Sequence, residues 1–140
     1  MVLLEIKILN TAIERVLNQE FSAYGITYAQ ATVIGYLTVA KRQNAECAVC
    51  QRDIEYSLGL AHPTVSSLLK RMEEKGIIEM RVQENDRRYK AIFLTEKGRE
   101  MSDVVREKIR EVTAQLFMDV DAEKQQEITD LLPKLIRNLS

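Results

Sequence analysis

Apolar residues near both ends of the chain recur at spacings of three and four, the pattern of one face of an amphipathic helix. A first helix over residues 3–21 would have an apolar face made of Leu3, Leu4, Ile6, Leu9, Ile13, Val16, Leu17 and Phe21. A helix capped by Thr95 would present Met101, Val104, Val105, Ile109, Val112 and Leu116. A last helix capped by Asp121 would present Ile128, Leu131, Leu132, Leu135, Ile136 and Leu139. Pro133 falls inside this last pattern and predicts a kink or a break there.

Shorter segments between these helices carry their own end signals. Gly25 ends the first helix. Thr27 and Gln30 form a capping box in "TYAQ", which opens a helix running to about Lys41. Residues 42–49 are polar and then small, so they predict a loop.

Two compact helices and a hairpin are expected next. The stretch "CQRDIEYSLGL" predicts a short helix that ends at Gly59. The stretch "HPTVSSLLKRMEEKG" predicts a second one, with Pro63 at its first position and Gly76 at its C-terminal cap. The segments "IIEMRV" and "YKAIFL" then have the composition of strands, and the polar "QENDRR" between them predicts a β-hairpin.

This order of elements defines the expected fold class, which is mainly α with a small β-hairpin wing. Two compact helices joined by a glycine-containing turn and followed by a hairpin make a winged helix-turn-helix. The N- and C-terminal helices are too long and too apolar for so small a core. We therefore expect them to be dimerisation helices that bury their surplus apolar surface against a second copy of the chain.

The overall charge is nearly balanced, with 20 basic and 21 acidic residues, so it neither demands nor excludes a nucleic-acid partner. Its distribution is uneven. Residues 61–99 hold nine basic and six acidic side chains, whereas residues 100–140 hold six basic and nine acidic ones. The basic charge is therefore concentrated in the second compact helix and the hairpin.

Hydropathy and cysteine content indicate where the protein works. No apolar run approaches the roughly 18 residues that would span a bilayer, so no membrane partner is expected. The first segment carries charges at helical spacing and lacks the basic start and cleavage site of a signal peptide. With two cysteines and no secretory signal, we expect a cytoplasmic protein with reduced thiols.

The helix that begins near Pro63 has one apolar and one polar face. The apolar face, which should pack inward, consists of Val65, Leu68, Leu69 and Met72. The polar face consists of His62, Pro63, Ser66, Ser67, Lys70 and Arg71. Short hydroxyls let such a helix approach a groove of DNA, its free N–H groups favour phosphate, and its long bases reach base edges or the backbone. On this helix alone, an ordinary solvated surface is equally compatible with the pattern.

The hairpin turn adds a second basic element. Arg87 and Arg88 lie in this turn, and Asp86 has the spacing to brace the Arg88 guanidinium through a bidentate pair. A cation held at such a tip can enter the strongly negative minor groove of DNA. Charged tips are common on protein surfaces, but a basic helix followed directly by a basic tip favours DNA binding.

These segments together resemble a known family. The stretch "QRDIEYSLGLAHPTVSSLLKRMEEKGIIEMRVQENDRRYKAIFLTEKG" is similar to the MarR (multiple antibiotic resistance regulator) family of bacterial transcription factors. In the wing, Asp86 and Arg88 precede Leu94 and Thr95 at the interval found in that family. The stretch "YGITYAQATVIGYL" is similar to the family's Gly-hydrophobic-Thr-x-x-Gln signature. The matching elements cover about residues 20–100, and the terminal helices match in layout only.

The resemblance implies a single MarR-type domain over residues 1–140. Its DNA-binding region would lie at about residues 28–98, and its dimerisation helices at residues 1–24 and 99–140. Such a protein is a homodimer and a sequence-specific transcriptional regulator that binds a pseudopalindromic, double-stranded DNA operator. Members are often repressors that a small, frequently aromatic effector releases from DNA.

The resemblance also assigns roles to individual residues. It puts on the recognition helix Pro63, Thr64, Ser66, Ser67 and Lys70. It makes Arg88 the wing arginine and Asp86 its brace. Arg71 occupies a basic position of the family from which the side chain anchors the wing or touches DNA.

The two cysteines leave an alternative open. Cys47 and Cys50 form a Cys-x-x-Cys ahead of a predicted helix, and a thiolate at Cys50 would be stabilised by the helix N-terminus. A thiol-based redox-sensing regulator would use such a pair, whereas two ordinary loop thiols are the interpretation we favour. A zinc site needs four ligands, and this pair with the lone His62 falls short, so no metal is expected.

Other classes of function have less support in the sequence. With no glycine-rich phosphate loop and no distinctive carboxylate pair, we expect no enzyme, no catalytic residues and no cofactor. A winged-helix protein-interaction module would use the same fold to bind a protein partner, and it remains the main alternative. One further set could line an effector pocket, although its spacing is more typical of a core: Phe21, Tyr24, Tyr28 and Tyr36.

Overall fold

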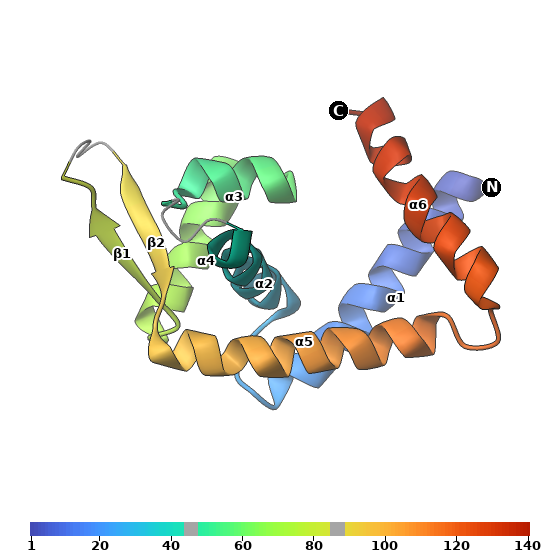
Figure 1. Cartoon of the computed structure of the whole chain (residues 1–140), viewed down its shortest axis with the longest axis horizontal. Helices are drawn as coiled ribbons and strands as arrows, with labels where there is room; N and C mark the ends of the chain where they lie inside the picture. Colours follow the sequence, from blue (N-terminus) through green and yellow to red (C-terminus); the bar gives the residue numbers. More distant parts are fainter. Residues whose placement is uncertain (44–47, 85–88) are drawn as a thin grey trace.

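Among the described residues, which are 1–43, 48–84 and 89–140, the computed structural model contains six helices and one two-stranded antiparallel sheet. In chain order these are α1 (Val2–Ser22), α2 (Tyr28–Gln43), α3 (Gln51–Leu58), α4 (His62–Glu74), β1 (Ile78–Val82), β2 (Lys90–Leu94), α5 (Glu96–Leu116) and α6 (Ala122–Asn138). The predicted fold class is confirmed. Figure 1 shows the hairpin at one end of the molecule and both termini at the other, with α5 running between them.

The ends of the helices follow the signals in the sequence. Gln30 Oε1 accepts the Thr27 N–H at 3.1 Å, and Thr27 Oγ1 accepts the Gln30 N–H at 3.1 Å, which is the predicted capping box. Thr95 and Asp121 likewise accept backbone N–H groups in the first turns of α5 and α6, at 3.1 and 2.8 Å. Each bond satisfies a donor that has no partner inside its own helix.

Helix α4 begins one residue earlier than predicted. The Val65 N–H bonds to the Ala61 carbonyl oxygen at 3.1 Å, so Pro63 is the second helical residue and not the first. The helix tolerates Pro63 there because the N–H groups of a first turn have no partner within the helix. At the other end, Gly76 follows the last turn with a left-handed φ of 74°, as expected for a glycine that ends a helix.

The sequence predicted a kink or a break at Pro133, and the break is wrong, because helix α6 runs unbroken through this residue. A proline inside a helix removes the hydrogen bond to the carbonyl four residues earlier, which belongs to Thr129. Every residue of α6 except Gln125 is exposed. Water can therefore solvate the freed carbonyl, and the helix continues.

The core lies where α1, α2, α3 and α4 meet the base of the hairpin. Its largest fully buried side chains are Phe21, Val33, Ile34, Ile54, Val65, Leu69, Met72, Ile77 and Ile78. Helix α5 packs along α1 and α2 and adds Val105 to this core. At the start of α5, a Cβ on Gly98 would lie 2.3 Å from the Ile77 carbonyl oxygen, so α5 approaches the base of the hairpin closely. The long helix is thereby fixed to the region that carries α4 and the sheet.

The two strands pair in one register, with Ile78 opposite Leu94 and Val82 opposite Lys90. The Ile92 N–H also bonds to the Val49 carbonyl oxygen at 2.8 Å. This bond uses part of the edge of β2 that does not pair with β1. The hairpin is therefore fixed to the body at its base and along β2. The segment between the strands includes residues 85–88, which lie outside the described residues.

Candidate nucleic-acid interface

Helix α4 buries its apolar face and exposes its polar one, as the spacing predicts. Buried or half-buried are Val65, Leu68, Leu69 and Met72. Exposed on the outer side are His62, Pro63, Thr64, Ser67, Lys70 and Arg71. Within the described part of the chain, neither Lys70 nor Arg71 forms an ion pair. Both cations are therefore available to a phosphate or a base edge.

The first turn of α4 is attached to α3. Gln51 Nε2 donates to Ser66 Oγ at 2.7 Å and to the His62 carbonyl oxygen at 3.3 Å. His62 Nδ1 lies 2.8 Å from Glu55 Oε2. Two side chains that the sequence put forward for DNA contact, Ser66 and His62, therefore also set the angle between the two helices. The spacing along the sequence gave no signal of these contacts, because the partners lie on a different helix.

The last turn of α4 is attached to the turn between α1 and α2. Lys75 Nζ donates to the Gly25 carbonyl oxygen at 2.7 Å and to Gln30 Oε1 at 2.9 Å. Lys97 Nζ, from α5, donates to the Lys75 carbonyl oxygen at 2.8 Å. Sequence reasoning missed the role of Lys75, because Gly25 and Gln30 are 50 and 45 residues away. The exposed face of α4 is thus held in place at both of its ends.

The hairpin beside α4 is stiffened by contacts across its strands. The Arg81 guanidinium lies 4.7 Å from the centroid of the Phe93 ring, a cation–π contact, and it also pairs with Glu79. The hydrogen bond from Arg81, together with its charge, lowers the pKa of the Glu79 carboxyl. Outside the described residues lie the predicted wing-tip residues Asp86, Arg87 and Arg88.

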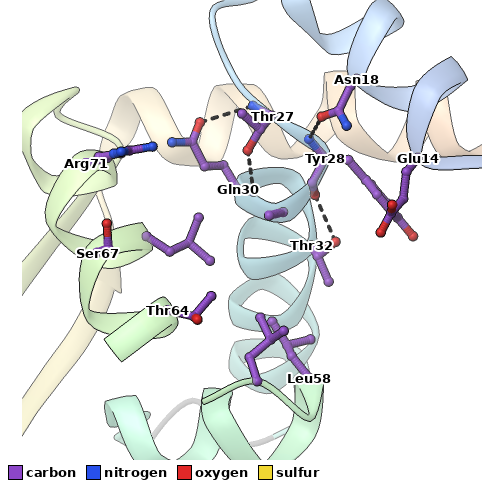
Figure 2. Close-up of a pocket in the computed structure, with 13 residues that line it drawn as sticks. Glu14, Asn18, Thr27, Tyr28, Gln30, Thr32, Leu58, Thr64, Ser67 and Arg71 are labelled. Carbon is purple, nitrogen blue, oxygen red and sulfur yellow. Dashed lines mark hydrogen bonds between the residues drawn. The ribbon is translucent and has the colours of Figure 1, made fainter. Parts of the chain in front are cut away.

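A cavity of about 780 Å³ opens between α1, α2 and α4 (Figure 2). Its volume suits a small molecule. The polar residues that line it are Glu14, Asn18, Thr27, Gln30, Thr32, Thr64, Ser67 and Arg71. The larger apolar ones are Tyr28, Leu58, Leu60 and Leu68. Because Thr64, Ser67 and Arg71 belong to α4, the cavity and the candidate DNA-binding face share one helix.

The aromatic set that the sequence suggested for such a pocket is divided. Tyr28 lines this cavity. Phe21 is buried in the core and Tyr36 packs against that core, whereas Tyr24 is exposed. The interpretation of this set as core residues therefore holds for Phe21, Tyr28 and Tyr36, and Tyr28 also lines the cavity.

Cys50 lies directly before α3. Its N–H donates to Asp53 Oδ2 at 2.9 Å, and its side chain is half-buried. Cys47 lies outside the described residues, so the expectation of two ordinary thiols stays a prediction. Among the residues that the structure describes, no group of three or more His, Cys, Asp or Glu side chains could hold a metal ion. None of the helices in these ranges is long and apolar enough to cross a membrane.

A helix seated on α3 with a polar outer face, followed by a hairpin fixed at its base, defines a winged helix-turn-helix protein. Residues 24–88 match the family model described as "MarR family". This region therefore belongs to the MarR family of transcription regulators, as the resemblance predicted. Proteins of this family are transcription regulators and not enzymes.

Solved structures match the whole length of the chain. The S. aureus MepR–DNA complex is 24% identical in sequence, with 100% of this chain and 99% of that chain covered and a TM-score of 0.89. S. aureus MepR in a DNA-binding conformation is 26% identical, with the same coverage and a TM-score of 0.83. A MarR transcriptional regulator from Methanosarcina mazei Go1 is 23% identical, with 98% and 94% covered and a TM-score of 0.83. The terminal helices thus complete the same fold around the matched region.

Proposed function

We propose that this protein binds a pseudopalindromic DNA operator as a homodimer and represses transcription until a small ligand releases it. The observation that carries the proposal is the outer face of α4, where Lys70 and Arg71 are exposed without an ion pair in the described part of the chain. The helix is held at both ends, by Gln51 and by Lys75. Such support matters because base readout requires side chains in fixed positions.

Beside α4, the hairpin would serve as the wing. Arg87 and Arg88 would reach the minor groove from its tip, with Asp86 bracing Arg88. The spacing of these residues in the sequence supports their roles. The pairing of the strands supports them too, because β1 ends at Val82 and β2 begins at Lys90, on either side of the turn. Pro63 and Thr64 would lie where the first turn of α4 enters the major groove.

The homodimer is supported by apolar surface that the chain leaves uncovered. On α1 the exposed large apolar residues are Val2, Leu3, Leu4, Ile6, Ile8 and Leu9. On α6 they are Ile128, Leu131, Leu132, Leu135 and Ile136. Helix α6 contributes no buried residue to the core of its own chain. A second copy would cover these faces and supply a second recognition helix for the other half-site.

The cavity between α1, α2 and α4 is the proposed effector site. Its wall on α4 includes Thr64, Ser67 and Arg71, which also belong to the proposed DNA-binding face. A ligand that engages this wall has different contacts in the DNA-bound and free proteins, which is the condition for shifting the equilibrium between them.

Selection of duplexes from a random pool, followed by fluorescence anisotropy with the selected duplex, tests the proposal. We expect the selected duplex to bind at least about 1,000-fold more tightly than a scrambled one, with affinity falling as salt rises. If no sequence is enriched and DNA does not bind at low salt, the fold serves instead as a protein-interaction module.

A further inference from the structure

His62, the only histidine of the chain, is the first residue of α4 and lies against α3. Its Nδ1 is 2.8 Å from Glu55 Oε2, an acceptor, and 3.0 Å from Gln51 Nε2, a donor. The Gln51 amide has two hydrogens, which Ser66 Oγ accepts at 2.7 Å and the His62 carbonyl oxygen at 3.3 Å. Nδ1 of His62 therefore carries a hydrogen and donates it to Glu55, which fixes the tautomer of the ring.

Because Nδ1 is held by Glu55, Nε2 is the ring atom that changes with pH. In the neutral ring Nε2 has a lone pair, whereas in the imidazolium it has a hydrogen that can be donated to a phosphate oxygen. Ser66 Oγ lies 3.5 Å from Nε2, at the limit of a hydrogen bond. The His62 side chain is 71% exposed and that of Glu55 only 21%. An anion that approaches this surface therefore meets the ring of His62 before the carboxylate behind it.

The ring borders a cleft of about 360 Å³ between α3, the start of α4 and the hairpin. Arg52 of α3 and Lys90 of β2 line the same cleft, and neither forms an ion pair within residues 1–43, 48–84 and 89–140. The other titratable groups that line it are Cys50, Glu55 and Tyr89. The Glu55 carboxylate alone would repel a phosphate, but an imidazolium beside it balances its charge. The cleft then keeps the net positive charge that the DNA backbone requires.

We propose that His62 contacts a DNA phosphate as an imidazolium, and that Glu55 is the positioning residue that holds the other hydrogen of the ring. Where the ring of the free protein is neutral, Nε2 takes up one proton from solvent as DNA binds, and the new N–H donates to a phosphate oxygen. Arg52 and Lys90 would contact the backbone beside it. This inference rests on the proposed DNA binding and goes beyond it, because it makes the affinity for DNA depend on pH.

The contact is tested by anisotropy with the selected duplex from about pH 6 to about pH 8, where imidazoles titrate. Affinity should fall as pH rises, because the complex holds the proton more firmly than the free protein does. His62→Gln keeps a donor but cannot titrate, so the native protein should lose at least about 5-fold more affinity over this range than the variant. Calorimetry in two buffers of different ionisation enthalpy should show proton uptake by the native protein only. Equal pH profiles, or native binding without proton uptake, would overturn the contact.

The positioning role of Glu55 has its own variant. Glu55→Gln keeps an acceptor for the Nδ1 hydrogen but removes the charge that favours the imidazolium. Its loss of affinity should therefore occur at a pH lower by about half a unit or more. Glu73→Gln removes the same charge from an exposed position on α4 and should keep the native profile. Identical profiles of the Glu55 and Glu73 variants would overturn the positioning role.

The DNA backbone has the same phosphates in any sequence, so a scrambled duplex at low salt tests the contact as well. If that duplex binds with proton uptake but no sequence is enriched in the selection, the proposed regulator fails and the His62 contact stands. If a selected duplex binds tightly without proton uptake, the contact fails and the regulator stands. If no DNA binds at low salt, both fail.

Discussion

Gly35 and Gly98 both lie in helices, yet their surroundings give opposite expectations for alanine at each position. A Cβ on Gly35 would meet nothing within 4 Å, so Gly35→Ala should stabilise the fold by about 0.5–1 kcal/mol. A Cβ on Gly98 would lie 2.3 Å from the Ile77 carbonyl oxygen, so Gly98→Ala should destabilise it by about 1–3 kcal/mol. Urea unfolding at one fixed protein concentration measures both free energies. A Gly98→Ala protein as stable as the native one would contradict the close packing of α5.

The thiols give a second prediction at the scale of single residues. Because we favour two ordinary thiols over a redox switch, replacing Cys47 and Cys50 together with Ser should leave operator affinity unchanged in reductant. Peroxide should not release the native protein from DNA in anisotropy measurements. Release of the native protein by peroxide, lost in the double variant, would instead support redox sensing.

At the scale of elements, caps and periodicity could be predicted because they act over a few residues. The bonds between Thr27 and Gln30 and the first-turn cap at Asp121 are of this kind. The contact between Lys75 and Gln30 could not be predicted, since it joins residues 45 apart and depends on how α4 packs on α2. Of the kink or break predicted at Pro133, the break was wrong, because the pattern does not reveal that α6 is solvated on its own chain.

Removing a cation from the recognition helix should change DNA binding in a different way from removing one from the wing. Arg88→Ala should weaken DNA binding, reduce the slope of the log–log salt dependence by about one, and alter specificity mainly beside each half-site. Lys70→Ala should act within the half-site, relaxing base preference if it reads a base and lowering affinity uniformly if it contacts phosphate. Anisotropy across a salt series measures both variants.

Asp86→Ala provides the control for the wing. Removing an acid near DNA would by itself strengthen binding, but the variant also removes the brace of Arg88. We therefore expect Asp86→Ala to weaken DNA binding, by less than Arg88→Ala does. Dimerisation should survive in all three variants. An Arg88→Ala protein with native affinity and an unchanged slope would show that the hairpin does not touch DNA.

At the scale of the whole molecule, the surplus of apolar surface on the terminal helices could be read from the sequence. The fold was needed to show that most of it lies on α1 and α6, because α5 packs against α1 and α2 of its own chain. Leu131 on α6 and Val39 on α2 are each 50% exposed and offer a matched pair. Leu131→Asp should convert the dimer to a monomer, because it puts a charge into the proposed interface, whereas Val39→Asp should remain dimeric. Sedimentation equilibrium at micromolar concentration measures the mass. A native protein of one chain's mass, 16.1 kDa, would contradict the dimer.

The central claim is that two copies of this chain read two half-sites of one operator. The most direct measurement is the stoichiometry and affinity of the complex with the selected duplex and with a duplex in which one half-site is scrambled. We predict two chains on the full duplex and an affinity lower by at least about 100-fold for the half-scrambled one, because the second recognition helix then loses its specific contacts. One chain on the full duplex, bound as tightly as to the half-scrambled duplex, would contradict the account.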